Sequence, residues 1–195
     1  MTVSLDDVAR SVVRRSGRRF AVASGTAEVG AAFRLRAEAA AEHGWAGEDR
    51  DAFDDRAVHV VGWDHDEPVS AGRIVFPPGP LPTEEACGLV ISPPGAVADV
   101  GRMVVARGHQ EFGHSGFVAL LAALYLEVPA HGLDVACGMM APRVRALTRF
   151  LGLRLELLGP EREHLGELRA PVRFDLERNF ATVEARWGDD SRLEN

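Results

Sequence analysis

A glycine-containing turn between an apolar run and a long apolar helix is the first candidate site for chemistry. The run covers residues 97–106, the turn contains Gln110, Gly113 and His114, and the helix is expected to begin at Ser115. The first N–H groups of a helix have no partner within it, and the helix dipole adds positive potential there. The turn therefore predicts a site for the phosphates of a pyrophosphate or phosphopantetheine arm. The alternative is an ordinary helix start, with Ser115 as N-cap and Gly113 as a turn residue.

A second group of candidates consists of charged and aromatic residues in the first half of the chain. Carboxylates can attract an ammonium group and help to remove its proton, and guanidinium groups can orient those carboxylates or bind an acceptor carboxylate. Aromatic side chains can wall an apolar acceptor site. The series is Arg36, Trp45, Asp49, Asp51, Phe53, Asp54, Arg73, Asp99 and Arg102. The alternative is an ion-pair network that fixes the N-terminal region without touching a substrate.

Both groups resemble motifs of one fold superfamily. The spacing Gln110-x-x-Gly113-x-Ser115 resembles the loop with which GNAT-fold acyltransferases hold the pyrophosphate of acyl-CoA, although Ser115 stands where Gly or Ala is expected. In order and spacing, the charged series is similar to that of the acyl-homoserine-lactone synthases and the N-acyl amino acid synthases, which have this fold. Asp49 and Asp99 replace glutamates of those families.

The resemblance covers about residues 19–175 and implies an α/β fold of the GNAT type. A mixed central sheet is flanked by helices, and two central strands, residues 97–106 and 133–138, splay apart to hold an acyl thioester. Met103, Val104 and Val105 are the expected donor-binding positions on the first of these strands, together with Gln110, Gly113, His114 and Ser115 in the turn. Ordinary core packing is the alternative for the two valines. The implied donor is acyl-CoA or the phosphopantetheine of an acyl carrier protein.

The implied reaction is direct attack of a neutral amine on the thioester. It needs a group that removes a proton, a donor to the developing oxyanion and a proton for the leaving thiolate. Asp99 is the first candidate for proton removal, and Asp51 and Asp54 are the second, with Arg36, Arg73 and Arg102 balancing and orienting the carboxylates. Many GNAT enzymes protonate the thiolate with a tyrosine on the fourth helix; here Thr148 stands at about that position, and the only tyrosine is Tyr125.

The acceptor is expected to contact the remaining members of the series. These substrate-binding candidates are Arg36, Trp45, Asp49, Phe53, Asp54 and Arg73.

Composition narrows the function further. The 195 residues are 46% hydrophobic, enough for one full core, and the formal charge of −7 disfavours a general nucleic-acid or anionic-membrane binder. All 22 basic residues are arginines, which excludes a Schiff-base lysine. Cys87 and Cys137 are far apart, and no spacing of ligand residues predicts a metal site. Without an apolar signal or membrane-spanning segment, we expect a single-domain cytoplasmic protein of undetermined oligomeric state.

Hydrophobic periodicity predicts the elements that position these residues. Helices are expected over residues 5–15, 26–43, 115–131 and 141–151, followed by a C-terminal helical tail over 176–195 whose helix reaches 187. Strands are expected over residues 19–23, 57–63, 69–76, 97–106, 133–138, 153–158 and 170–175. Thr26 is expected to cap the second helix, residues 47–56 to form a loop, and the proline-rich residues 77–94 to cross the surface without regular structure.

The sequence thus predicts an N-acyltransferase that moves an acyl group from acyl-CoA or an acyl carrier protein to a small amine or amino acid derivative. Two alternatives stay open. One is a signal or specialised-metabolite synthase with a nucleoside- or tRNA-linked substrate. The other is a GNAT-like module that binds an acyl thioester without transferring it.

Overall fold

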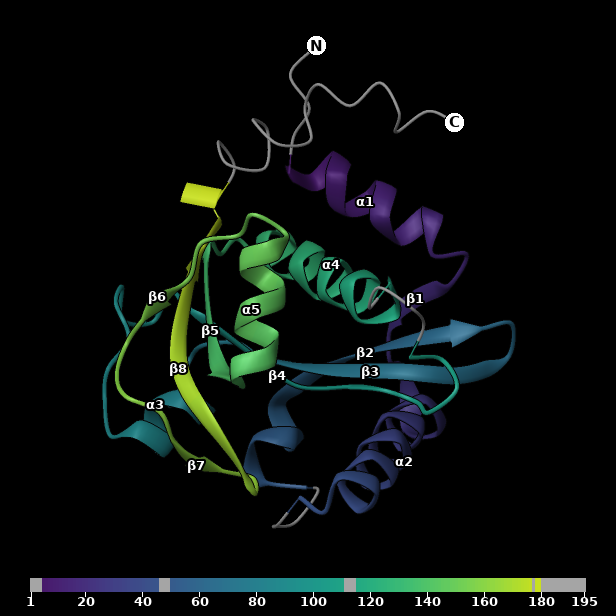
Figure 1. Cartoon of the computed structure of the whole chain (residues 1–195), viewed down its shortest axis with the longest axis horizontal. Coiled ribbons are helices and arrows are strands. Elements are labelled where there is room, and N and C mark those ends of the chain that lie inside the picture. Colours follow the sequence, from purple (N-terminus) through teal and green to yellow (C-terminus); the bar gives the residue numbers. More distant parts are fainter. Residues whose placement is uncertain (1–4, 46–49, 111–114, 177, 180–195) are drawn as a thin grey trace.

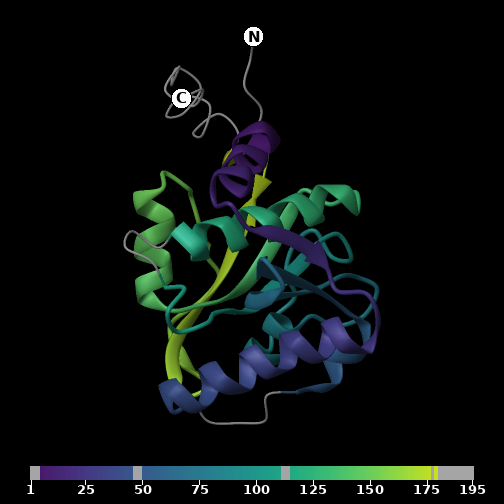
Figure 2. The same ribbon diagram turned by 90° about the vertical axis from the view of Figure 1, so that its right-hand side faces the viewer.

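Helices cover both faces of a twisted sheet in the computed structural model (Figures 1 and 2). The structure describes residues 5–45, 50–110, 115–176 and 178–179. The strands are β1 Arg19–Val22, β2 Ala57–Asp64, β3 Glu67–Val75, β4 Ala98–Val105, β5 Val135–Met140, β6 Glu156–Leu157, β7 Arg162–His164 and β8 Glu167–Asp175. They follow the order β1-β2-β3-β4-β5-β8-β6, with β7 paired to β8. All pairs are antiparallel except β4–β5, so the predicted mixed α/β fold is confirmed.

The helices form two layers, one packed on each face of the sheet. The helices are α1 Leu5–Arg15, α2 Gly25–His43, α3 Pro82–Cys87, α4 Ser115–Ala130 and α5 Pro142–Phe150, and a 3-10 turn, η1, spans Ala52–Arg56. Helix α2 lies on one face of the sheet, and α1, α4 and α5 lie on the other (Figure 2). Leu120 and Leu124 of α4 pack with Ile74, whereas Leu35 of α2 packs with Val61. None of the described helices combines the length and apolarity needed to cross a lipid bilayer.

The two central strands part soon after they meet. Their parallel ladder consists of two pairs, Ala98 with Ala136 and Asp99 with Cys137. At the next position of β5, a Cβ atom on Gly138 would overlap the carbonyl oxygen of Val100, so only glycine allows the backbones to cross this closely. Beyond this crossing, the backbone groups on the facing edges of β4 and β5 have no ladder partners among the residues that the structure describes.

A β-bulge lies just after that crossing. Arg102 and Met103 of β4 together oppose the single residue Gly72 of β3, and Arg102 has the left-handed φ of 51°. The inserted residue changes the alternation of the strand, because Val100 packs toward α4 whereas Val104, four positions later, packs toward α2. A non-glycine residue in this conformation costs about 1 kcal/mol or more, which the surrounding contacts must offset.

Several expected boundaries are wrong for local reasons. Helix α2 begins at Gly25 with Ser24 as N-cap, not at Thr26, because the carboxylate of Glu28 accepts hydrogen bonds from the N–H and hydroxyl of Ser24. The expected loop over 47–56 contains η1, whose first turn is capped by Asp51. The proline-rich segment contains α3, which starts at Pro82, where a missing N–H costs nothing.

The C-terminal part of the sheet also differs from expectation. The strand expected over 153–158 is the two-residue β6, β7 was not expected, and β8 begins at Glu167 rather than at residue 170. A short hairpin thus joins β7 to β8. Of the expected C-terminal tail, the structure describes only its first residues, 176, 178 and 179, and the rest lies outside the described residues.

Candidate active site

Five residues that are far apart in sequence form one ion-pair cluster. Arg36 binds Asp54 through two hydrogen bonds, of 2.8 Å from Nη1 to Oδ1 and 3.1 Å from Nη2 to Oδ2. Arg73 donates from Nη1 to Oδ1 of Asp51 at 2.6 Å and to Oδ1 of Asp54 at 2.9 Å. Arg102 donates to Oδ2 of Asp51 at 2.9 Å. The structure therefore brings together five residues that the sequence series contained.

The turn η1 holds the two carboxylates of this cluster in place. Oδ1 of Asp51 accepts from the N–H of Phe53 at 3.0 Å, and Oδ2 of Asp54 accepts from the N–H of Asp51 at 2.9 Å. This reciprocal pair is a capping box, which requires its two side chains to stand three residues apart. The bulge in β4 turns Arg102 toward Asp51 from the other side.

Burial and charge divide the cluster into an inner and an outer part. The side chains of Arg36, Asp54 and Arg73 are buried, whereas those of Asp51 and Arg102 are 30% and 16% exposed. Burial alone would favour the neutral acids, but hydrogen bonds from the arginines outweigh it and lower the pKa of Asp51 and of Asp54. Burial and the nearby guanidinium of Arg36 lower the pKa of Arg102. The outer pair is thus the part that a ligand can reach.

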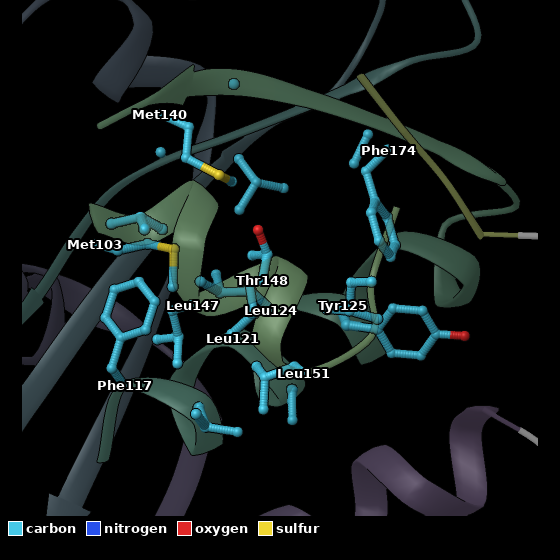
Figure 3. Close-up of a pocket in the computed structure, with 18 of the residues that line it drawn as sticks. Met103, Phe117, Leu121, Leu124, Tyr125, Met140, Leu147, Thr148, Leu151 and Phe174 are labelled. Carbon is cyan, nitrogen blue, oxygen red and sulfur yellow. The ribbon is translucent and has the colours of Figure 1, made fainter. Parts of the chain in front are cut away.

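A cavity of about 590 Å³ lies where β4 and β5 part, and apolar side chains line most of it (Figure 3). They come mainly from β4, α4, β5, α5 and β8, and further lining residues come from α1 and from the end of α2. The labelled residues are Met103, Phe117, Leu121, Leu124, Tyr125, Met140, Leu147, Thr148, Leu151 and Phe174. The size is within the range of small-molecule sites, and the lining suits an apolar chain.

Four of the expected donor-binding residues line this cavity. Met103, Val104 and Val105 line it, and so does Gln110, whose side-chain amide donates to the carbonyl oxygen of Val105 at 3.1 Å. Ser115 is the first residue of α4. Gly113 and His114 lie outside the described residues, as does Asp49 of the charged series.

The two aromatic residues of the series differ in position: Trp45 lines the cavity, and Phe53 does not. Trp45 lines the cavity and stacks on His43, with ring centroids 4.7 Å apart. Phe53 is not among the lining residues; it packs against the core beside α3 and lies under the guanidinium of Arg73, 6.0 Å from the ring centroid. Phe53 thus packs beneath the guanidinium of Arg73 in the ion-pair cluster.

Asp99 lies behind the cavity wall rather than in it. Only 4% of the residue is exposed, and Oδ2 accepts from the N–H of Thr83 at 2.7 Å, with Sγ of Cys137 at 3.6 Å. Its neighbours Val100 and Gly101 line the cavity, but Asp99 does not. Burial raises its pKa. The side chain therefore ties α3 to β4.

The two hydroxyl groups considered for the leaving thiolate both line the cavity, and both have partners. Thr148 donates to the carbonyl oxygen of Arg145 at 2.9 Å, and Tyr125 donates to Oδ1 of Asp6 at 3.1 Å. Burial and the charge of Asp6 raise the pKa of Tyr125.

Sequence motifs did not identify a group of polar residues at the cavity that includes two arginines and a glutamate. Arg143, Glu167 and Arg169 line it, and Glu167 binds Arg169 at 3.1 Å and lies 3.7 Å from Nε of Arg143. None belongs to a local motif, because the hairpin β7–β8 and helix α5 meet the cavity only through tertiary packing. Within the described ranges, no three His, Cys, Asp or Glu side chains gather closely enough to hold a metal ion.

Comparison with known proteins identifies the fold. Neither a family model nor a curated protein sequence matches this chain. Among solved structures, the acyl-homoserine-lactone synthase LasI is similar with a TM-score of 0.71 at 17% identity, over 88% of this chain and 95% of that one. FeeM, an N-acyl amino acid synthase from uncultured soil microbes, gives 0.68 at 13% identity, over 82% of this chain and 91% of that one.

A third structure adds a bound donor. BjaI, a CoA-dependent acyl-homoserine-lactone synthase solved with SAM and isopentyl-CoA, gives a TM-score of 0.66 at 18% identity, over 83% of this chain and 82% of that one. The chain therefore has the fold that the sequence resemblance predicts, shared with acyl-homoserine-lactone and N-acyl amino acid synthases.

Proposed function

We propose that this protein is an acyltransferase that moves an apolar acyl group from a thioester to a small amine. The observation that carries the proposal is the parting of β4 and β5, which opens into the apolar cavity and leaves the ion-pair cluster beside it at the bulge. The acyltransferases that share this fold support it.

The unpaired edges of β4 and β5 suit the donor. Beyond the crossing at Gly138, their N–H and C=O groups, apart from the Val105 carbonyl that accepts from Gln110, are available to the amide groups of a pantetheine arm, as a third strand would use them. The acyl chain then enters the apolar part of the cavity, where each buried CH₂ contributes about 0.8 kcal/mol. Acyl-CoA is our first choice of donor, because BjaI is described with isopentyl-CoA, and an acyl carrier protein is the second.

The chemistry is a direct transfer. The bound ammonium group first gives up one proton to water; the neutral amine nitrogen then attacks the thioester carbonyl, the new C–N bond forms and the C–S bond breaks, and a second proton of the nitrogen ends on the leaving sulfur. Asp51 is the partly exposed carboxylate of the cluster, so we assign to it the attraction of the ammonium group, with Arg102 fixing its orientation. We rank Asp51 ahead of Asp99, because Asp99 is buried against α3.

A thioester-binding module without turnover is the second candidate. Its support is that Thr148 and Tyr125 use their hydroxyl protons within the protein. In this case the thioester would bind in the same cavity, and no amide would form.

An acyl-CoA series from acetyl to dodecanoyl, offered with a panel of amines, tests the proposal through thiol release and the mass of the amide. We expect turnover that rises with chain length until the cavity is filled. Leu147→Trp fills part of the cavity and should reduce use of the longest chains by about tenfold, equivalent to about two CH₂ groups, while sparing the shortest. Leu157→Trp makes the same change at a 58% exposed residue outside the lining and is the matched control.

Binding of acyl-CoA without thiol release from any amine would support the module instead. An equal effect of the two tryptophan variants on every chain length would remove the cavity from the proposal.

A further inference from the structure

His43, the last residue of α2, brings a proton-accepting atom to the cavity. It is one of the lining residues, together with Ala39, Trp45 and Arg102. Its Nδ1 atom lies 2.9 Å from the carbonyl oxygen of Ala39. A carbonyl oxygen can only accept a hydrogen bond, so Nδ1 carries the hydrogen and the neutral ring keeps its lone pair on Nε2. Within the described residues, no hydrogen bond or ion pair engages Nε2.

Two packing contacts connect this imidazole to the strand proposed to bind the donor. The ring of His43 stacks on Trp45, with centroids 4.7 Å apart and planes inclined by 23°. Trp45 in turn packs against the core cluster that contains Ala39 and Val104. Val104 stands two residues after Arg102 on β4, just past the bulge at which the ion-pair cluster and the cavity meet. His43 is therefore built into the α2 side of the proposed active site.

The carboxylates of this site are already bound to arginines. Asp51 accepts from two arginines of the ion-pair cluster, and Glu167 accepts from Arg169. Burial alone would raise the pKa of Asp51, but the arginine bonds lower it, so this carboxylate attracts a cation and holds a proton weakly. Histidine is the side chain that ordinarily exchanges protons near neutral pH. His43 is the one histidine among the described residues that line the cavity.

The charged groups on the elements around His43 pair with one another. These ion pairs join Glu42 of α2 to Arg107 after β4, Asp51 of η1's cap to Arg102 of β4, and Glu167 to Arg169 on β8. In the part of the chain that the structure describes, none of them includes the imidazole of His43. A proton that leaves the acceptor therefore finds Nε2 without a competing ion pair.

We propose that Nε2 of His43 accepts, through one water molecule, the proton that the acceptor ammonium group loses before it attacks. This inference rests on the proposed acyl transfer and names the group that takes this proton. Asp51 attracts the ammonium group, and the water takes one proton from the nitrogen as it gives one to Nε2. The neutral amine then attacks the thioester, and the imidazolium returns its proton to solvent before the next turnover.

His131 offers a matched control, because the chain builds it in the same way outside the cavity. It directly follows α4, its Nδ1 lies 2.8 Å from the carbonyl oxygen of Glu127 four residues earlier, and its ring stacks on Phe76 with centroids 4.0 Å apart. Both histidines are exposed, but only His43 lines the cavity. His43→Ala and His131→Ala thus remove equivalent local contacts, and only the first removes the proposed proton acceptor.

The variants are compared by thiol release with one acyl-CoA and one amine. We expect His43→Ala to lower kcat/KM for the amine at pH 7 by about 100-fold, within the usual range for a lost general base, and to leave the KM for acyl-CoA unchanged. Added imidazole should restore part of the rate of His43→Ala, whereas His131→Ala should keep the wild-type rate with and without imidazole.

A pH series separates proton removal from a purely structural role. After subtraction of the uncatalysed reaction, the deficit of His43→Ala should shrink as the pH approaches and passes the pKa of the amine, because the acceptor then arrives neutral. His43→Gln keeps a polar side chain that cannot take up a proton, and it should show the same deficit and the same recovery. Circular dichroism and Tm establish that the variants are folded, and His43→Gln decides if His43→Ala is not.

Equal losses in His43→Ala and His131→Ala would overturn the inference while acyl transfer stood. So would a deficit in both His43 variants that high pH does not reduce. Thiol release from no amine by the wild-type protein would reject the acyl transfer itself and the proton acceptor with it.

Discussion

The ion-pair cluster and the apolar wall of the cavity meet at the same bulge of β4 but are built in opposite ways. In the cluster, Asp54 receives bonds from Arg36 and Arg73, and a capping box fixes its backbone. The apolar wall instead surrounds about 590 Å³ of space, and its side chains come from α4 and α5 and from the strands β4, β5 and β8. One region is filled by its own contacts, and the other leaves space for a ligand.

This difference separates stability from specificity. Charged groups inside the fold must be paired and held, since an unpaired buried charge is costly, and the cluster therefore carries a large share of the local stability. The cavity wall has no such requirement, so its residues can change the ligand at a smaller cost in stability. The two regions should respond differently to substitution.

Removing the innermost carboxylate is the strongest test of the comparison. Asp54→Ala leaves Arg36 and Arg73 buried without their shared partner and should lower the free energy of unfolding by about 3–5 kcal/mol, measured by urea denaturation. Asp66→Ala, in the exposed turn between β2 and β3, removes the same charge and should change the free energy of unfolding by less than about 0.5 kcal/mol. Equal losses for the two variants would show that the cluster is not the stabilising region.

Changing the outer carboxylate should affect turnover more than stability. Asp51→Asn keeps the cap to Phe53 but removes the charge that attracts the ammonium group and binds Arg73 and Arg102. We expect kcat/KM for the acceptor to fall by about 10- to 100-fold, the equivalent of one charge-assisted hydrogen bond. Steady-state thiol release measures it.

Asp99→Asn is the counterpart that ranks the two carboxylates. Its amide oxygen can still accept from Thr83, and it removes a buried acid whose raised pKa disfavours ionisation, so stability should stay equal or rise. Turnover should change by less than about twofold. A loss larger than that of Asp51→Asn would restore Asp99 to the first place that the sequence assigned to it.

The sequence singled out the members of the cluster because they lie in local motifs. The spacing between Asp51 and Asp54 reflects a capping box, and Arg73 and Arg102 stand on strands with clear apolar patterns. The left-handed φ of Arg102 was not readable, since arginine rarely adopts it. The family resemblance implied the fold class and the order of the apolar segments agreed with it; the fold class was confirmed even though Ser24, not Thr26, is the N-cap of α2.

The sequence could not predict the ion pairs that Glu167 forms with Arg143 and Arg169. Arg169 reaches Trp45 only because a short hairpin returns β8 to the end of α2, and no local pattern encodes a contact over that separation. Asp99 is the opposite case: its place in a strand suggested a catalytic role, and the structure places it against α3, within the proline-rich segment, where it accepts from the N–H of Thr83. Both cases depend on tertiary packing rather than on periodicity.

The smallest expected effect concerns the histidine beside the cluster. His59 is buried 3.9 Å from Asp54 and edge-on to Phe33, and its ring nitrogens have no hydrogen-bond partner among the described residues. Burial, which outweighs the charge of Asp54, lowers its pKa below 6.5, so it is neutral in the folded protein at pH 7. As pH falls through 6.5 the unfolded chain takes up a proton that the folded chain does not, and stability decreases until the folded pKa is passed.

His59→Phe should therefore weaken the loss of stability between pH 7 and 5 by about 1 kcal/mol, while leaving the neutral value nearly unchanged, because the ring still packs on Phe33. The variant should still lose some stability as the pH falls, because burial also lowers the pKa of His164. Urea denaturation at a series of pH values measures the effect, and His65→Asn is the control, since His65 is exposed and asparagine tolerates its φ of 52°. If both variants kept the wild-type dependence of stability on pH, His59 would not be a neutral buried group beside the cluster.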